Sequence, residues 1–338
     1  MRRHFVTAVT LGAIALTACS DSALDPTLQG NATPEDQTEI TQLLEESGFF
    51  ADEFGVDGMV LGAPAEQTAG IYGSPSEIQG EVPLPERWGR HHKRPVRRSL
   101  TVEVDEIEGV AWVTKRVAFE GEFVFAAATD GGAEAIRKPM HHTLIQSARF
   151  ERATDDGVGD PPPEEPKDEP PTGSPQNGDQ HQCRWRLVAV SPAQWVMTEP
   201  IDQTVEIVRV VVYVDDEPVL EVENPNELYE VDGRLPHLAL GQVMTVRAWV
   251  EGGSPDNDPS RYVFLHWQHR SPETRIWMRR QMEFVEDDEN GPHYVRSWEV
   301  LAAGRERIAV DLIDSQSFAV TDDDDYNANA WGIPYIIE

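Results

Sequence analysis

Near the C-terminus, a run of aspartates and asparagines offers oxygen atoms that could bind a cation. The stretch reads TDDDDYNANAWGIPY, and its alternate positions give four candidate calcium ligands, Asp323, Asp325, Asn327 and Asn329. An EF-hand loop also requires glycine at its sixth position and glutamate at its twelfth, whereas Ala328 and Pro334 stand there. The EF-hand is therefore excluded. Two interpretations stay open: a turn before the last strand, which we favour because Asp and Asn side chains bond their own backbone, and a calcium site of another type.

Two adjacent histidines, His141 and His142, are the second set of residues that could do chemistry. They lie in KPMHHTLIQSARFERA, which alternates like a strand, so their side chains point to opposite faces and cannot easily hold one metal ion together. Only one of them can enter a pocket, where Asp105 or Glu122 could complete an acid/base pair. We favour an ordinary sheet histidine. The sequence has no zinc-protease, nucleophile-elbow or phosphate-loop motif, so we predict no catalytic residue, no metal centre apart from the calcium alternative, and a protein that is not an enzyme.

One basic cluster interrupts this acidic chain, in the stretch RWGRHHKRPVRR. Its basic residues are Arg87, Arg90, Lys93, Arg94, Arg97 and Arg98. They could dock an anionic ligand or lipid headgroups. We favour the alternative that the surplus carboxylates of the chain itself neutralise them.

The N-terminus carries the most specific signal. Two arginines precede a short apolar segment, and residues Leu16, Thr17, Ala18 and Cys19 complete a signal-peptide end with small residues. The apolar segment is shorter than the ~20 residues that span a bilayer. Leu-Thr-Ala-Cys resembles the bacterial lipobox, which implies cleavage after residue 18 and lipidation of Cys19. We therefore expect a signal peptide at residues 1–18 and a lipidated tether at 19–34, in a bacterial cell-envelope protein held at the outer membrane or the cell surface.

Charge and cysteine content narrow the classes of partner. The 338 residues carry a formal net charge of −32, and because binding to phosphate groups needs a basic surface, nucleic acid is excluded as a partner. Only two cysteines occur. If Cys19 is acylated, Cys183 has no partner for a disulfide within the chain.

The strand and helix patterns predict a mostly β chain with an α+β part before an all-β part. PEDQTEITQLLEESGFFADEFG has the apolar spacing of a short amphipathic helix, with Gly48 as an early break and Gly55 as the stop. After an irregular stretch, the segments from about residue 99 to residue 199 alternate like half-buried strands. Residues 154–181 are acidic and rich in proline, so we expect a disordered insertion there. Its flanks, HTLIQSARFERA and CRWRLVAVSP, look like two arms of one hairpin whose tip has been extended, since long loops cost little entropy. We favour this over an interdomain linker.

Two family resemblances follow from these patterns. The helix, the hairpin VDEIEGVAWVTKRVAFEGEF and the closing strands ARFERA and CRWRLVAVSP resemble NTF2-like, or SnoaL-like, domains over residues 35–199, which implies a cone-shaped pocket. Residues 200–338 contain seven or eight short strands at close spacing and resemble an immunoglobulin-like β-sandwich. The fold alone implies no function.

Two functional hypotheses remain open. The first is a lipid-anchored, non-catalytic surface protein whose Ig-like part binds or packs on another envelope protein, a surface protein or a glycan, with calcium-stabilised adhesion as a variant. The second is an enzyme or small-ligand binder that uses the NTF2-like pocket. They differ in one feature, because the second needs an open pocket with polar residues such as His141 or His142, and a sheet interior filled with Phe, Trp and Val would exclude it.

Overall fold

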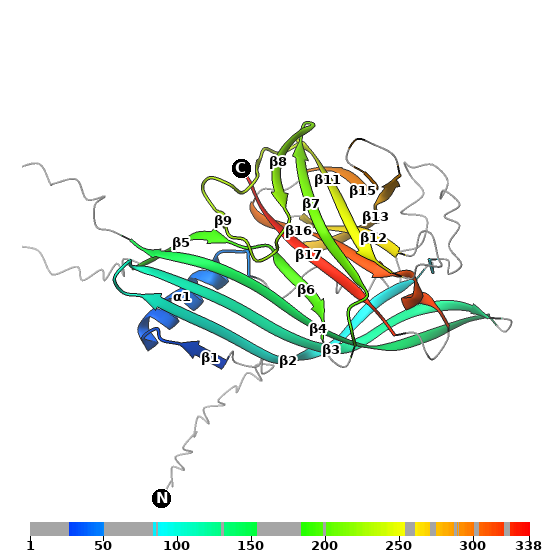
Figure 1. Ribbon diagram of the computed structural model, residues 1–338, viewed down its shortest axis with the longest axis horizontal. Coiled ribbons are helices and arrows are strands. Elements are labelled where there is room, and N and C mark those ends of the chain that lie inside the picture. The colour runs from blue at the N-terminus through cyan, green and yellow to red at the C-terminus, as the bar shows by residue number, and fades with distance from the viewer. Residues whose placement is uncertain are drawn as a thin grey trace, which may run out of the picture.

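The computed structural model describes residues 27–50, 84–85, 87–129, 132–153, 184–198, 201–253, 261–270, 275–286, 289, 291–300, 304–320 and 325–338. This part of the chain is mostly β, as the sequence predicts, and it has one α-helix and two sheets (Figure 1). The strands are β1 (Thr27–Gly30), β2 (Trp88–Asp105), β3 (Val110–Thr129), β4 (Gly132–Arg152), β5 (Trp185–Val190), β6 (Ala193–Met197), β7 (Val205–Val214), β8 (Glu217–Val222), β9 (Tyr229–Glu230), β10 (His237–Leu238), β11 (Val243–Gly252), β12 (Arg261–Arg270), β13 (Arg275–Gln281), β14 (Glu283–Val285), β15 (His293–Glu299), β16 (Gly304–Asp314) and β17 (Ala328–Ile337). The helices are α1 (Pro34–Glu46) and a 3₁₀ helix, η3 (Ser315–Phe318). The predicted disordered insertion, the signal peptide and Cys19 lie outside the described residues.

The helix forms where the apolar periodicity places it. Thr33 is its N-cap, and its hydroxyl accepts a hydrogen bond from the Asp36 backbone N–H while Pro34 occupies the first turn. The apolar face buries Ile40 and Leu44 against the sheet. The chain leaves the helix through Gly48, whose φ of 77° is in the left-handed region.

The first half of the large sheet is a ribbon of three long antiparallel strands, β2, β3 and β4. Two register shifts bend β2, one between His92 and Arg94 and one between Pro95 and Arg97. Beside the first shift stands Gly121 of β3, where a Cβ atom would lie only 2.4 Å from the His91 carbonyl oxygen. These features let the ribbon curve, so that its far end, which contains Trp88 and Phe123, packs against β12 and β16 (Figure 1).

The hairpin predicted around the acidic insertion is confirmed. Strands β4 and β5 pair antiparallel, with Arg152 opposite Trp185. The two arms therefore meet directly on either side of the segment at 154–183. Trp185 is buried, and its indole N–H donates to Asp36 of α1 over 2.9 Å, which ties the hairpin to the helix.

One sheet connects the parts of the chain that the sequence divides at residue 200. Its strand order is β1-β2-β3-β4-β6-β17-β16-β12-β13, and with the side branches β5, β9 and β10 it has 12 strands. β6 joins the two halves because it pairs with β4 on one side and with β17 on the other. The final strand thus lies in the middle of the sheet.

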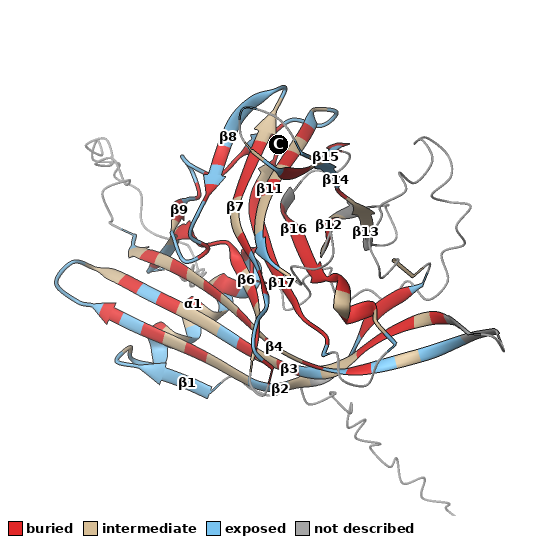
Figure 2. Ribbon diagram, turned by 45° about the vertical axis from the view of Figure 1, so that its right-hand side comes forward, coloured by how far each residue is buried: buried red, intermediate tan, exposed pale blue. Residues whose placement is uncertain are grey.

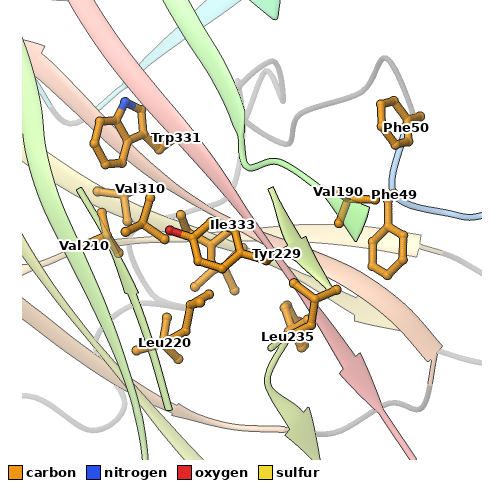
Figure 3. Packing of buried hydrophobic residues seen from close by; sticks show 14 of the residues in the cluster. Phe49, Phe50, Val190, Val210, Leu220, Tyr229, Leu235, Val310, Trp331 and Ile333 are labelled. Carbon is orange, nitrogen blue, oxygen red and sulfur yellow. The ribbon is translucent and has the colours of Figure 1, made fainter. Parts of the chain in front are cut away.

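The second sheet, β14-β15-β11-β7-β8, packs on the C-terminal half of the first. Their shared core contains Val210 and Leu220 from one sheet and Val310, Trp331 and Ile333 from the other (Figure 3). Strand β16 is buried along the length for which burial is described (Figure 2). Because side chains alternate along a strand, its other face lies toward the curved ribbon.

Against that other face, the ribbon forms two further cores. One contains Phe119 of β3, Trp195 of β6 and Ala330 of β17. The other contains Trp88 and Phe123 from the far end of the ribbon together with residues of β12, β16 and η3. The described fold is therefore three-layered over part of its length: five-stranded sheet, C-terminal half of the large sheet, and curved ribbon. No helix among the described residues has the length and apolarity that crossing a membrane requires.

Candidate functional site

A group of buried, ionisable side chains lies between the ribbon and β16. Arg90 of β2 forms a two-pronged salt bridge with Asp311, with Nη1 and Nη2 each 2.7 Å from a carboxylate oxygen. Both side chains are fully buried. Paired geometry of this kind is what a buried ion pair requires, since each charge would otherwise lose its hydration without compensation.

Two further polar side chains complete this buried cluster. Nε2 of His266, on β12, lies 3.1 Å from the second carboxylate oxygen of Asp311. Tyr326, just before β17, accepts a hydrogen bond at its hydroxyl from Nε of Arg90. We call Arg90, Asp311, His266 and Tyr326 the ionic cluster; none of the four is more than 1% exposed.

A second arginine closes the cluster from the side of β13. The guanidinium carbon of Arg279 lies 3.7 Å from the centre of the Trp88 ring, a cation–π contact, and the group also donates to the Trp88 carbonyl oxygen. Burial lowers the pKa of Arg279 to about 10, with Asp311 opposing the shift and the like charge of Arg90 adding to it. Two guanidinium groups among the described residues, those of Arg90 and Arg279, therefore act on the carboxylate of Asp311.

Burial and pairing act in opposite directions on the pKa values within the cluster. Burial alone would raise the pKa of Asp311, but the charge of Arg90 and the hydrogen bonds from His266 and Arg90 outweigh it and hold that pKa well below its usual range. Burial would lower the pKa of Arg90, and Asp311 and Tyr326 raise it instead. For His266, burial prevails over the bond to Asp311 and lowers the pKa, so the imidazole stays neutral.

The lowered pKa of His266 predicts a specific acid sensitivity. As the pH falls through about 6.5, the unfolded chain binds a proton at this residue before the folded chain does. The contribution of His266 to the free energy of unfolding is therefore complete above that pH and is lost below it. Urea unfolding at pH 7.5 and at pH 5.5 should show a smaller difference in His266→Asn than in the wild type, with His141→Asn as the control for losing an imidazole. An equal difference in wild type and His266→Asn would contradict the assignment.

The predicted pocket histidines separate as expected for neighbours on a strand. His142 is 1% exposed and stacks on Trp195, with ring centroids 4.9 Å apart, and it meets Tyr326 edge-on at 5.5 Å. His141 lies half-buried on the opposite face. His142 therefore packs among aromatic rings beside the ionic cluster.

The two carboxylates considered as partners for these histidines have other contacts. Asp105 caps the turn between β2 and β3 by accepting from the backbone N–H groups of Ile107 and Glu108. Glu122 forms a salt bridge of 2.7 Å with Arg137. Neither contact involves a histidine.

The four candidate calcium ligands do not share one environment. Asp323 lies outside the described residues and Asp325 is exposed. Asn327 and Asn329 are buried, and their amide oxygens accept the backbone N–H groups of Thr204 and Ile207. Their amide nitrogens donate to the carbonyl oxygens of residues 202 and 195. Asn329 thus joins β7 and β6 to the final strand, and Asn327, just before that strand, holds the segment that leads into β7.

The ionic cluster has a structural role: it holds the ribbon to the C-terminal half of the large sheet. We call this role the lock between layers. A carboxylate, an imidazole, a phenol and a guanidinium are groups that acid/base catalysis uses, but here each is out of contact with solvent and is bonded to another member of the cluster. Within the part of the chain that the structure describes, no three His, Cys, Asp or Glu side chains gather in a way that could hold a metal ion. No family model matches the chain, and no curated protein matches it.

Sequence reasoning missed the ionic cluster. It placed Arg90 in a basic cluster and favoured neutralisation by carboxylates of the chain, which the salt bridge to Asp311 confirms for Arg90, but it named no partner and did not expect a buried position. A local signal was present at two of the other members. Asp311 and His266 each interrupt an otherwise apolar stretch, IAVDLI and VFLHW, and a polar residue inside a buried strand needs a partner.

Proposed function

We propose that this chain is a lipid-anchored, non-catalytic protein of the bacterial cell envelope that binds or supports another envelope or surface component through its β-sandwich. The observation that carries the proposal is the N-terminal segment, in which two arginines, a short apolar stretch and Leu16-Thr17-Ala18-Cys19 follow one another. Acyl chains on Cys19 would hold the chain at a membrane, since each buried methylene contributes about 0.8 kcal/mol.

The packing of the ribbon supports a non-catalytic role. Its inner face is filled by large apolar side chains, including Phe119 and Phe123, and Trp195 covers it from β6. An enzyme or ligand binder of the NTF2-like kind would need this face to be open. His142, the inward histidine, lies in that packed interior.

The outer face of the five-stranded sheet supports a binding role for the sandwich. Arg209 stacks on Trp249 at 4.4 Å and Arg247 on Tyr213 at 4.8 Å, measured from the guanidinium carbon to the ring centre. All four side chains are partly exposed. Arginine and aromatic side chains are the residue types enriched where proteins bind partners.

Replacing Cys19 tests the anchor directly, and the second cysteine provides the control. Full-length chain and its Cys19→Ser and Cys183→Ser variants would be produced in a bacterial host fed a palmitate analogue that can be tagged. We expect the wild type and Cys183→Ser to carry the label and to sediment with membranes, and Cys19→Ser to lose both properties. Label retained in Cys19→Ser, or absent from the wild type, would refute the proposed anchor.

A further inference from the structure

We propose that the outer face of the ribbon, formed by β2, β3 and β4, lies against the lipid surface to which the chain is anchored. We call this the ribbon face. The inference rests on the proposed lipidation of Cys19, and it adds which surface of the fold the membrane meets.

The position of the first strand places the membrane beside the ribbon. Eight peptide links separate Cys19 from Thr27, and since each residue spans at most about 3.6 Å, the anchor lies within roughly 30 Å of that residue. Thr27 begins β1, which pairs with the edge of β2 opposite Ser99–Val102. The sandwich is attached at the other side of the ribbon (Figure 1). The lipid surface therefore lies near the β1 edge.

Within the described part of the chain, only the outer face of the ribbon is free to meet that surface. On the inner face, Leu100, Val102 and Val113 are buried and belong to the core that includes α1. Side chains opposite one another on paired strands share a face, so the ribbon face has three defined rows. Reading from β2 to β4, these rows are Ser99-Arg116-Ile145, Thr101-Thr114-Ser147 and Glu103-Trp112-Arg149.

The side chains of the ribbon face suit a bilayer surface. Arg97 and Arg116 are exposed, and Arg149 is partly exposed. Trp112 is 47% exposed, with Arg149 over its ring at 5.9 Å. Arginines bind lipid phosphates, and tryptophan rings favour the headgroup region. The middle row, Thr101-Thr114-Ser147, carries three hydroxyls, which can bond to headgroup oxygens.

The local charge of the ribbon face favours its contact with a lipid surface. With a net charge of −32, most of the surface would be repelled by an anionic leaflet. On the ribbon face, Arg97, Arg116 and Arg149 are matched in number by Glu103, Glu120 and Glu151, and Arg137 pairs with Glu122, so these side chains carry no net charge. A face without net charge is repelled by acidic headgroups less than the acidic average of the chain would be.

Cysteine accessibility on vesicles tests the orientation. In a full-length Cys183→Ser background, lipidated Arg116→Cys and Ser297→Cys chains would be added to preformed vesicles of phosphatidylethanolamine with a minor share of phosphatidylglycerol. Both positions are exposed, and Ser297 lies on the five-stranded sheet. The rate of reaction with a bulky, water-soluble maleimide would then be compared between vesicles and detergent.

We expect position 116 to react about tenfold more slowly on vesicles than in detergent, since several arginines favour docking together, and position 297 to react at the same rate in both. Equal rates for position 116 in a lipidated, vesicle-bound chain would overturn the inference and leave the anchor intact. Protection of position 116 in cells but not on vesicles would also overturn it, because a protein would then cover the face. A chain that fails to acquire lipid or to float with vesicles would refute the anchor itself.

Discussion

Asp311→Asn is expected to lower the free energy of unfolding by about 3–5 kcal/mol, because it removes the carboxylate that pairs with the fully buried guanidinium of Arg90. The same substitution weakens the bond to His266 and removes the negative charge that offsets the repulsion between Arg279 and Arg90. The strands that carry these groups belong to two different layers. We therefore expect the loss to appear in global unfolding, measured by urea titration followed by circular dichroism.

A double substitution separates the cost of an unpaired charge from the value of the pair. Replacing both charges, in Arg90→Met with Asp311→Leu, should cost less than Asp311→Asn alone, since apolar side chains of similar volume remove the two fully buried charges together and leave neither without the other. Asp325→Asn is the matched control: it makes the same chemical change at an exposed position, and should alter stability by less than about 0.5 kcal/mol. If Asp311→Asn behaved like this control, the ionic cluster would not be the lock between layers.

The sequence predicts the local parts of this fold well. Helix α1 has its cap, its apolar face and its terminating Gly48 within one short segment. The pairing of β4 with β5 could be predicted across the acidic insertion because both arms alternate and because a long loop closes at low entropic cost. In each case the information lies within the residues concerned and needs no distant partner.

The parts that the sequence does not predict depend on distant contacts. Arg90 and Asp311 are 221 positions apart, and nothing near Arg90 distinguishes it from the basic residues that follow it. The division at residue 200 follows a change in the sequence pattern, from a helix and long alternating segments to closely spaced strands. In the structure, however, β6 pairs with both β4 and β17, so one sheet contains strands from both sides of residue 200. Strand pairing of this kind is decided by tertiary packing rather than by local pattern.

The aspartate and asparagine stretch shows how a metal-like spacing can arise for another reason. Alternate positions of a strand share a face. Metal ligands at every second residue therefore have the same spacing as side chains that point toward one neighbouring strand. Asn327 and Asn329 satisfy the second description, because their amides bond to the backbone at the start of β7 and beside it. Spacing alone could not separate these cases.

Asn329→Asp separates them by experiment and is expected to lower the free energy of unfolding by about 3 kcal/mol or more. Asn329 is fully buried, accepts from the Ile207 N–H at 3.1 Å and donates to the Trp195 carbonyl oxygen at 3.0 Å. A carboxylate keeps the first bond, loses the second and buries a charge opposite a carbonyl oxygen. At a calcium site the same change would strengthen the ligand, and added calcium would stabilise the folded chain by mass action.

Thermal unfolding with calcium and with a chelator distinguishes the two roles in both proteins. We expect the Tm of the wild type to be the same in the two conditions and the Tm of Asn329→Asp to be lower in both, because the amide oxygen of Asn329 is already occupied by a backbone N–H. Asn329→Ala serves as the companion variant, since it removes both hydrogen bonds without adding charge and should cost less than Asn329→Asp. A calcium-dependent rise in Tm, larger in Asn329→Asp than in the wild type, would instead identify a cation site and would favour calcium-stabilised adhesion.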